Sequence, residues 1–259
     1  MSTILFDKIV FGPIHSRRLG VSLGMNLLPV DGKICTFDCI YCECGWNKDH
    51  RVASRFPSRE AVREALEIKL SSMKAEGVAP DVITFAGNGE PTVHPEFEGI
   101  IDDTIALRDC FFPSAKIAVL SNSTMLGKPG VFRALNRVED NILKLDSVLD
   151  SRIQQLNAPN QPSFCFARLL EDLCRFNGNL IIQTMFLRGE LDGKSVDNTT
   201  EEEIVGWLEA LKKIHPKQVM IYTIDRETPA KNLLKVPKAE LETIADRARA
   251  LGFDVSVAG

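Results

Sequence analysis

Four cysteines crowd into ten positions of this chain, within the stretch ICTFDCIYCECGW at residues 34–46. Three residues separate Cys35 from Cys39, two separate Cys39 from Cys42, and Cys44 follows two positions later. Three thiolates leave one iron of a cubane [4Fe–4S] cluster without a protein ligand, whereas a closed electron-transfer cluster of this type takes four cysteines. An open iron can bind a small molecule, and Cys44 is awkwardly placed to reach the fourth corner. The spacing therefore favours a cluster held by Cys35, Cys39 and Cys42.

The remaining cysteines leave one alternative of another class open. A structural zinc site completed by Cys44 would also use four thiolates, although zinc sites usually show separated Cys-x-x-Cys pairs. Cys110, Cys165 and Cys174 are scattered, and seven cysteines are a poor layout for a disulfide framework. We expect these three to be buried filler and Cys44 to be a free thiol. A non-catalytic iron–sulfur or zinc protein remains the competing class.

Composition bounds the functions that the chain can have. With 259 residues, 44% hydrophobic and 25% charged, it can bury a full core. The formal charge of −4 gives no overall footprint for nucleic acid, so a nucleic-acid partner is left open without support. No stretch approaches the roughly 18 apolar residues that a membrane span needs. We expect a soluble, cytoplasmic protein without membrane contact.

Short apolar, β-rich runs alternate with helical patterns along the chain. Because strand-then-helix units imply a parallel sheet with right-handed crossovers, the pattern predicts an α/β fold, a partial (β/α)6 barrel. We expect one domain over residues 1–259, with an N-terminal extension at 1–19, a cluster loop at 30–46 and a short extra strand at 253–257. The expected barrel strands span residues 20–28, 82–86, 116–122, 141–146, 180–186 and 218–223.

Helix ends can be placed from capping patterns. A helix should begin after Ser58 and end near Gly77, because apolar residues recur between them at helical spacing. Thr200 and Glu203 have the spacing of a capping box, which predicts a second helix. The last helix should end at Gly252. In such a barrel the chemistry gathers at the C-terminal ends of the strands, and the cysteine loop follows the first strand.

The stretch CTFDCIYC resembles the Cys-x3-Cys-x2-Cys signature of the radical S-adenosylmethionine (SAM) superfamily, with Tyr41 before the last cysteine as that signature often has. FAGNGEPTVHPEF at residues 85–97 resembles the Gly-Gly-Glu motif that holds the SAM amino group, although Asn88 splits the glycines. FGPIHSRRLGVSLG, ILKLD and IYTIDRETP are similar to one branch, small proteins related to the wyosine-synthesising tRNA enzymes. The resemblance runs from about residue 11 to the C-terminus.

The resemblance implies cofactors and a reaction. It implies a [4Fe–4S] cluster on the three cysteines, SAM chelated to the open iron, and an electron donor such as flavodoxin or ferredoxin. SAM would then cleave to methionine and a 5′-deoxyadenosyl radical, which takes hydrogen from a small-molecule, peptide or tRNA substrate. An activase that installs a glycyl radical on a partner enzyme is the alternative. The wyosine enzymes carry further cysteines upstream, and none precedes Cys35 here, so their chemistry is not transferred.

Polar residues at the expected strand ends are the candidates for binding SAM. Glu90 is an acid at a strand end where an ammonium group would need a partner. Its turn could instead be a plain strand-to-helix connection, and the other strand ends could simply be solvated. We expect Gln183 and Thr184 to face the barrel interior. The full set of predicted cofactor residues is Tyr41, Gly87, Asn88, Gly89, Glu90, Pro91, Asn122, Ser123, Asp146, Gln183 and Tyr222.

Three residues are the candidates for substrate binding. Arg17 and Arg18 precede the first strand and could clamp a carboxylate or phosphate with two hydrogen bonds each. A solvent-exposed basic turn is the alternative, because this segment should start at the end of the barrel opposite to the mouth. His94, beside Pro95, is either a helix-entry residue or an acid–base group.

Overall fold

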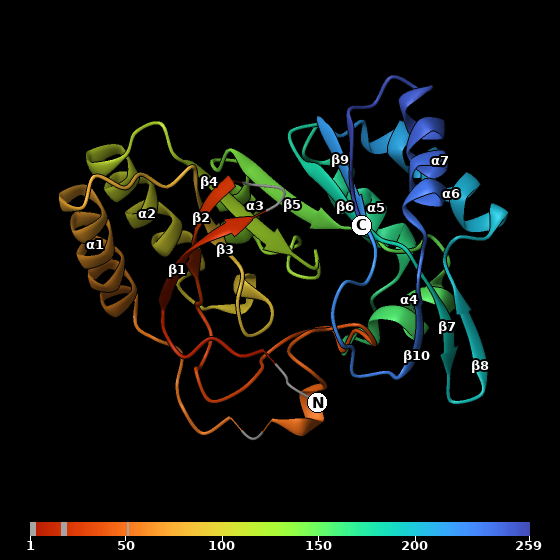
Figure 1. The fold of residues 1–259 in the computed structure, drawn as a ribbon, viewed down its shortest axis with the longest axis horizontal. Coiled ribbons are helices and arrows are strands. Elements are labelled where there is room, and N and C mark those ends of the chain that lie inside the picture. The colour runs from red at the N-terminus through yellow and green to blue at the C-terminus, as the bar shows by residue number, and fades with distance from the viewer. Residues whose placement is uncertain (1–3, 17–19, 51) are drawn as a thin grey trace.

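The computed structural model describes residues 4–16, 20–50 and 52–259. One curved sheet has the strand order β1-β2-β3-β4-β5-β6-β9-β11, and its first strand alone runs antiparallel to its neighbour (Figure 1). The predicted partial barrel of parallel strands is confirmed, and so is the extra strand near the C-terminus, β11, which pairs with β9. The strands are β1 (Val10–Ser16), β2 (Gly20–Met25), β3 (Val82–Phe85), β4 (Lys116–Ser121), β5 (Asp140–Lys144), β6 (Ile181–Met185), β9 (Gln218–Tyr222) and β11 (Val255–Ala258).

Helices cover the outer face of this sheet (Figure 1). The predicted caps are confirmed: the Ser58 side chain accepts from the amide of Ala61, and Thr200 accepts from the amide of Glu203. The last helix ends at Arg249, slightly before the predicted boundary. The helices are α1 (Arg59–Ala75), α2 (Phe97–Phe111), α3 (Pro129–Leu135), α4 (Asp150–Asn157), α5 (Phe166–Cys174), α6 (Glu201–Ile214) and α7 (Lys238–Arg249), with 3-10 turns η1 (Asn47–Asp49) and η2 (Pro91–Val93).

The two faces of the sheet bury different sets of residues. The outer face packs on the helices in one large apolar cluster, while the inner face holds a smaller apolar layer with one residue from each of five strands. Because successive side chains of a strand point to opposite faces, Gln183 and Thr184 cannot both face the interior. Thr184 bonds to the indole of Trp207 in the helix layer, so the expectation for Thr184 was wrong. The inner layer consists of Val82, Ala118, Ile142, Ile181 and Met220.

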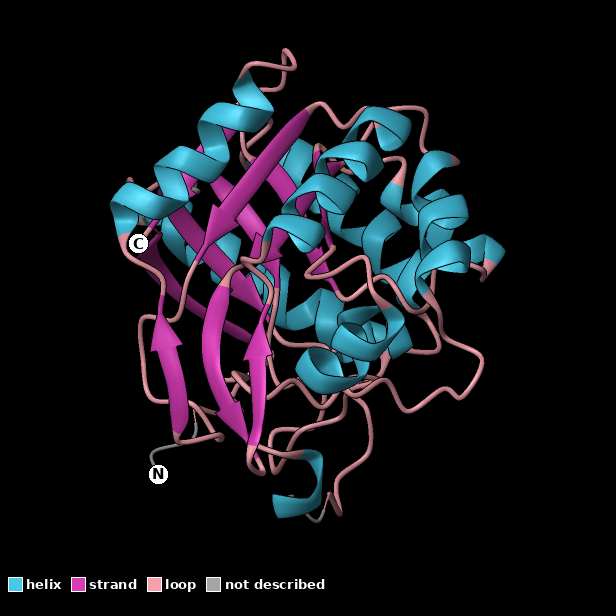
Figure 2. Cartoon of the chain, turned by 90° about the vertical axis from the view of Figure 1, so that its right-hand side faces the viewer, coloured by secondary structure: helices cyan, strands magenta, loops and turns pink. Residues whose placement is uncertain are grey.

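A second, three-stranded sheet was not predicted. Its order is β10-β7-β8, and it consists of β7 (Leu187–Leu191), β8 (Lys194–Asp197) and β10 (Asn232–Lys235). It lies below the main sheet in Figure 2. Asp192 and Gly193 connect β7 to β8 with φ angles of 51° and 76°. Asp-Gly with both φ angles positive is the sequence mark of a tight hairpin, so a local signal for this sheet exists.

Strand β1, within the predicted N-terminal extension, adds a side strand to the barrel sheet. Strand β1 starts at the barrel mouth, where Val10 pairs with Met25, and it ends at the opposite end, where Ser16 pairs with Gly20. A β-carbon at Gly24 would lie 2.1 Å from the Phe11 ring, so the bare glycine lets this ring rest on β2. No helix in the described part of the chain is both long and apolar enough to cross a membrane.

Candidate cluster and cofactor site

The cysteine loop pairs directly with the turn that follows β3. The amide of Ile34 donates to the Asn88 carbonyl at 2.9 Å, and the amide of Glu90 donates to the Ile34 carbonyl at 3.1 Å. Gly89 sits between these bonds with a φ of 130°, and a β-carbon there would lie 1.9 Å from the Ile34 oxygen. Only glycine therefore allows the loop and the turn to approach so closely. The two motifs of the sequence form one backbone unit.

The asparagine that splits the two glycines has a structural task. Its side chain is fully buried, and it exchanges two hydrogen bonds with the backbone of Phe6, at 2.8 and 2.9 Å. It also donates to the carbonyl of Pro29 at 2.9 Å. The amide of Asn88 donates to the side chain of Asn26 at 3.1 Å. Asn88 thus ties the N-terminal segment and the end of β2 to the turn.

Helix α4 and a buried lysine fix the other side of the loop. The amides of Asp38 and Ile40 donate to carbonyls at the end of α4, at 2.8 and 3.0 Å. Lys33 donates to the Gly45 carbonyl at 2.7 Å and pairs with Asp38. Burial would lower the pKa of Lys33, but the nearby cysteines and Asp38 raise it overall. The loop is therefore held in shape by the chain itself.

Each of the three predicted ligands has a polar side chain against its sulfur. Asn122 Nδ2 lies 3.5 Å from Cys35 Sγ, and Asn157 Nδ2 lies 3.4 Å from Cys39 Sγ. Burial raises the pKa of Cys35 and raises that of Cys39 to about 11. A hydrogen bond from Cys44 lowers the pKa of Cys42 to about 6.

The chemistry of this donor set fits a cluster with three protein ligands. Three sulfurs come from one preformed loop, and they lie among apolar and aromatic side chains such as Phe37, Tyr41 and Met185. In the described part of the chain, no group of three or more His, Cys, Asp or Glu side chains converges closely enough to hold a single metal ion. A cubane is larger than one ion, and amide donors to cysteine sulfur are typical surroundings of such clusters.

The carboxylate of Glu90 already accepts hydrogen bonds from its own turn and from the end of β4. Its carboxylate is 2% exposed and accepts from the amide of Thr92 at 3.0 Å, the hydroxyl of Thr92 at 2.5 Å, the hydroxyl of Ser121 at 2.9 Å and the amide of Asn122 at 2.6 Å. Burial raises the pKa of Glu90, although these donors oppose the shift. Three of these bonds reach Oε1 and one reaches Oε2, of the roughly four lone-pair positions that a carboxylate has. Glu90 therefore shapes the turn from within.

A buried polar network lies at the ends of β5 and α4. Tyr41 donates to Asp146, and Lys144 Nζ lies 2.9 Å from the Tyr41 hydroxyl and 3.4 Å from Asp146. Asp146 also accepts from the amide of Met185 at 2.9 Å. Burial would lower the pKa of Lys144, but Asp146 and other neighbours raise it overall, so this ammonium stays charged. Sequence reasoning missed Lys144, although it stands on a predicted strand two residues before Asp146.

Two further predicted residues, Ser123 and His94, are buried and hydrogen-bonded to the backbone. Ser123, at a φ of 71°, is buried and donates to the Lys144 carbonyl. His94 is buried: its Nδ1 accepts from the amide of Glu96 and its Nε2 donates to the Pro57 carbonyl, so both ring nitrogens serve the local fold. Burial lowers the pKa of His94. The predicted substrate residues Arg17 and Arg18 lie outside the described residues.

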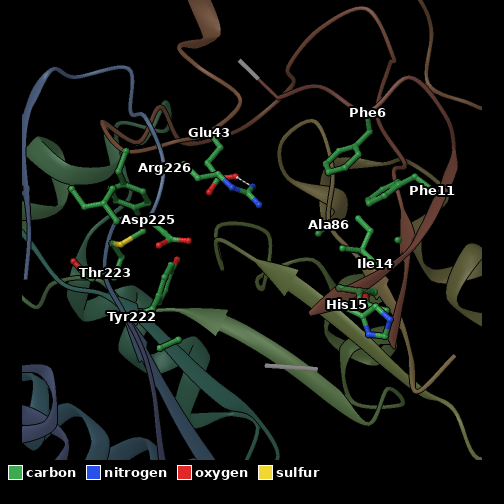
Figure 3. A pocket seen from close by; sticks show the side chains of 18 residues that line it. Phe6, Phe11, Ile14, His15, Glu43, Ala86, Tyr222, Thr223, Asp225 and Arg226 are labelled. Carbon is green, nitrogen blue, oxygen red and sulfur yellow. Dashed lines mark hydrogen bonds and ion pairs between the residues drawn. The ribbon is translucent and has the colours of Figure 1, made fainter. Parts of the chain in front are cut away.

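A cavity of about 340 Å³ opens beside the cysteine loop. Figure 3 shows two opposed walls, with Phe6, Phe11, Ile14, His15 and Ala86 on one side and Tyr222, Thr223 and Asp225 on the other. At the rim, Arg226 forms an ion pair with Glu43, which stands between two cysteines of the loop. Tyr41 also lines the cavity. The cysteine loop, the network and the cavity are thus continuous.

Comparisons with known proteins address both sequence and fold. No family model matches the chain. A UPF0026 protein of Methanocaldococcus jannaschii is 31% identical over 240 residues, which cover 91% of this chain and 69% of that protein.

Solved structures share the architecture at low sequence identity. A radical SAM methyltransferase from Sphaerobacter thermophilus has a TM-score of 0.67 at 14% identity, over 92% of this chain and 65% of its own. SuiB from Streptococcus suis, bound to S-adenosylmethionine, has a TM-score of 0.63 at 15% identity, over 90% of this chain and 50% of its own. This chain thus spans half of SuiB and just under two thirds of the methyltransferase. It belongs to the UPF0026 family and has the partial-barrel fold of the radical SAM superfamily.

Proposed function

We propose that this protein is a radical SAM enzyme whose cluster is held by Cys35, Cys39 and Cys42. The observation that carries the proposal is the direct pairing of the cysteine loop with the turn at residues 87–91, next to a cavity of about 340 Å³. Pairing of this kind brings the cysteine-bearing loop beside a strand-end turn, and Tyr41 and Glu43 of that loop line the cavity. The SAM-bound SuiB structure, which has the same fold, supports SAM as the second cofactor.

The proposed cofactors would supply the chemistry, and this chain would position the reacting groups. Bound together, the cluster and SAM would supply reductive cleavage of the sulfonium to methionine and a 5′-deoxyadenosyl radical that takes a hydrogen atom. The chain positions SAM and substrate and excludes water, and the apolar wall of Phe6 and Phe11 on the open side of the barrel suits that task. A one-electron donor such as flavodoxin or ferredoxin completes the proposal.

The roles that we assign to individual residues follow their surroundings. Tyr41, Ala86 and Tyr222 line the cavity and are assigned to contacts with SAM or substrate. Glu90 is assigned to holding the turn, because its oxygens already accept four hydrogen bonds. The buried ammonium of Lys144 lies beside Tyr41, and it is assigned to pairing with Asp146 and holding the Tyr41 hydroxyl.

The volume of the cavity favours a compact substrate group. Small-molecule pockets usually span about 300–1,000 Å³, and this one lies at the lower end of that range. A small molecule, or a single side chain or base presented by a larger partner, fits such a space. We therefore propose hydrogen abstraction from one compact group.

The test is anaerobic reconstitution followed by iron and sulfide analysis, absorption spectra and chromatography of SAM products under dithionite. We expect about four irons per chain and slow formation of 5′-deoxyadenosine. Cys39→Ala should abolish both, because it removes one of three ligands. Cys110→Ala is the matched control, since Cys110 is exposed on α2; the expectation that Cys110, Cys165 and Cys174 are buried was wrong, because the other two are also partly exposed.

The Cys44→Ala variant separates the proposed cluster from the competing class. We expect it to retain the cluster, because the Cys44 thiol donates to the Gly87 carbonyl and is not assigned as a ligand. A zinc site would instead lose its metal with either Cys39 or Cys44. Cluster-loaded wild-type protein that never produces 5′-deoxyadenosine would contradict the enzyme, and stimulation only by a glycyl-radical partner would identify an activase.

A further inference from the structure

Two buried asparagine side chains point at the sulfurs of the cysteine loop. Asn157 is 2% exposed, and its Nδ2 contacts Cys39 Sγ at 3.4 Å; Asn122 is 6% exposed, and its Nδ2 contacts Cys35 Sγ at 3.5 Å. These distances lie within the range of N–H···S hydrogen bonds. Asn157 was not singled out from the sequence, and it stands at the last position of α4, more than a hundred residues from Cys39.

The chemistry of the neighbours fixes the orientation of the Asn157 amide. Its Nδ2 lies 2.8 Å from Asp146 Oδ2 and 3.1 Å from the Tyr41 hydroxyl. An ionised carboxylate can only accept, so the group that faces Asp146 must be the amide NH2. One hydrogen of this NH2 goes to Asp146, and the second is shared between Cys39 Sγ and the Tyr41 hydroxyl. Asn157 is a donor to this sulfur and cannot accept from it through Nδ2.

The backbone also holds Asn157 in place. Its carbonyl accepts from the amide of Asp38 at 2.8 Å, and the carbonyl of Leu156 accepts from the amide of Ile40 at 3.0 Å. These two bonds lie on either side of Cys39 in the loop. These main-chain bonds fix the backbone of Asn157 beside Cys39, while Asp146 and Tyr41 hold its side-chain amide.

An N–H donor to a ligand sulfur acts on the redox balance of a cluster. The reduced cluster carries one more electron than the oxidised cluster, and part of that charge lies on the thiolate sulfurs. A donor at the sulfur stabilises the more negative state more strongly, which raises the reduction potential. Resting on the proposed function, we infer that Asn157 is a positioning residue that raises the cluster's reduction potential through its hydrogen bond to Cys39.

The Asn157→Leu variant tests this inference in reconstituted holoprotein. Leucine has a similar size and no donor. At a fixed solution potential, we expect the ratio of reduced to oxidised cluster to fall about tenfold, which is 59 mV for a one-electron couple. The readout is an anaerobic potentiometric titration followed by electron paramagnetic resonance, with iron content measured in parallel.

Two further variants make the result specific. Asn157→Asp keeps the shape of the side chain but removes both amide hydrogens, and the proton that it would share with Asp146 leaves no donor for Cys39, so its potential should also lie below that of the wild type. Asn141→Leu is the matched control: Asn141 is a fully buried asparagine whose side-chain amide has no hydrogen-bond partner among the described residues. It lies near the start of β5, at the end of the strand away from Asp146. Its potential should equal that of the wild type.

The outcomes separate this inference from the proposed function. Wild-type protein that binds no cluster would overturn both. A loaded wild type with unchanged potentials in Asn157→Leu and Asn157→Asp would overturn the inference alone. Loss of the cluster in both folded variants would also overturn it, because Asn157 would then serve assembly, and a shift in Asn141→Leu of equal size would show a general effect of the fold.

Discussion

The cysteine loop and the cavity beside it are built in opposite ways. In the loop and the turn that pairs with it, buried groups such as Lys33 and Asn88 satisfy their hydrogen bonds within the chain. At the cavity, the walls include small residues such as Gly24 and Ala86, and the rim carries an exposed ion pair between Glu43 and Arg226. Buried bonded groups tolerate little change, whereas exposed pairs tolerate much. The molecule thus specifies its proposed cofactor chemistry more strictly than its substrate.

Gly89→Ala should break the loop side of this comparison and give the largest effect. A methyl group would lie 1.9 Å from the Ile34 oxygen at a backbone angle that L residues rarely adopt. We expect the free energy of unfolding to fall by about 3 kcal/mol or more, and cluster content to fall with it. Chemical denaturation and iron analysis measure both. Gly127→Ala is the control, because nothing lies within 4 Å of its added β-carbon.

Glu90→Gln should have an intermediate effect and sharpen the role of the turn. The glutamine NH2 would face groups that can only donate, such as the Asn122 amide, so at least one buried bond is lost. We expect a loss of about 1–3 kcal/mol in the free energy of unfolding. Glu98→Gln, which alters a partly exposed pair with Arg133, should cost less than about 1 kcal/mol. Equal stabilities for wild type and Glu90→Gln, together with weaker SAM binding, would return Glu90 to its predicted role.

Arg226→Ala should give the smallest effect on the scaffold. Its side chain is 61% exposed, and its partner Glu43 is 44% exposed. Pairs of this kind contribute about 0–1 kcal/mol, so the free energy of unfolding and the cluster content should stay near those of the wild type. Arg247→Ala, which breaks another surface pair, is the control. A loss above about 2 kcal/mol in Arg226→Ala alone would show that the rim belongs to the rigid part of the molecule.

Much of the barrel could be predicted because its signals are local. Six apolar runs became β2, β3, β4, β5, β6 and β9, and capping residues marked the starts of α1 and α6. The hairpin of β7 and β8 was not predicted, although Asp192 and Gly193 are a local sequence signal for its turn. The strands were placed from the alternation of strands and helices, and a hairpin does not follow that alternation. Thr184 was predicted to face the barrel interior because its side chain is polar. It follows Gln183 directly, and neighbouring side chains in a strand point to opposite faces, so Thr184 faces the helices.

The candidate site also contains some residues that local sequence predicts and others that it does not. The cysteines could be selected from spacing, because all three lie in one loop. Asn157 and Lys144 could not, because their meaning depends on contacts with residues far away in the chain: Asn157 reaches Cys39, and Lys144 reaches Tyr41. In the sequence, Asn88 is a departure from the Gly-Gly-Glu motif. Its two hydrogen bonds to the backbone of Phe6 explain why an asparagine stands at this position.

The bonds between Asn88 and Phe6 have a consequence for measurement. The amide hydrogen of Phe6 is held by a side chain of the turn, so its exchange with deuterated solvent depends on whether that turn stays closed. Exchange at this single amide, followed by mass spectrometry or by nuclear magnetic resonance, therefore reads the state of the turn from the far end of the chain. Hydrogen exchange at Phe6 therefore reports on the site without any change to the sequence and without a bound ligand.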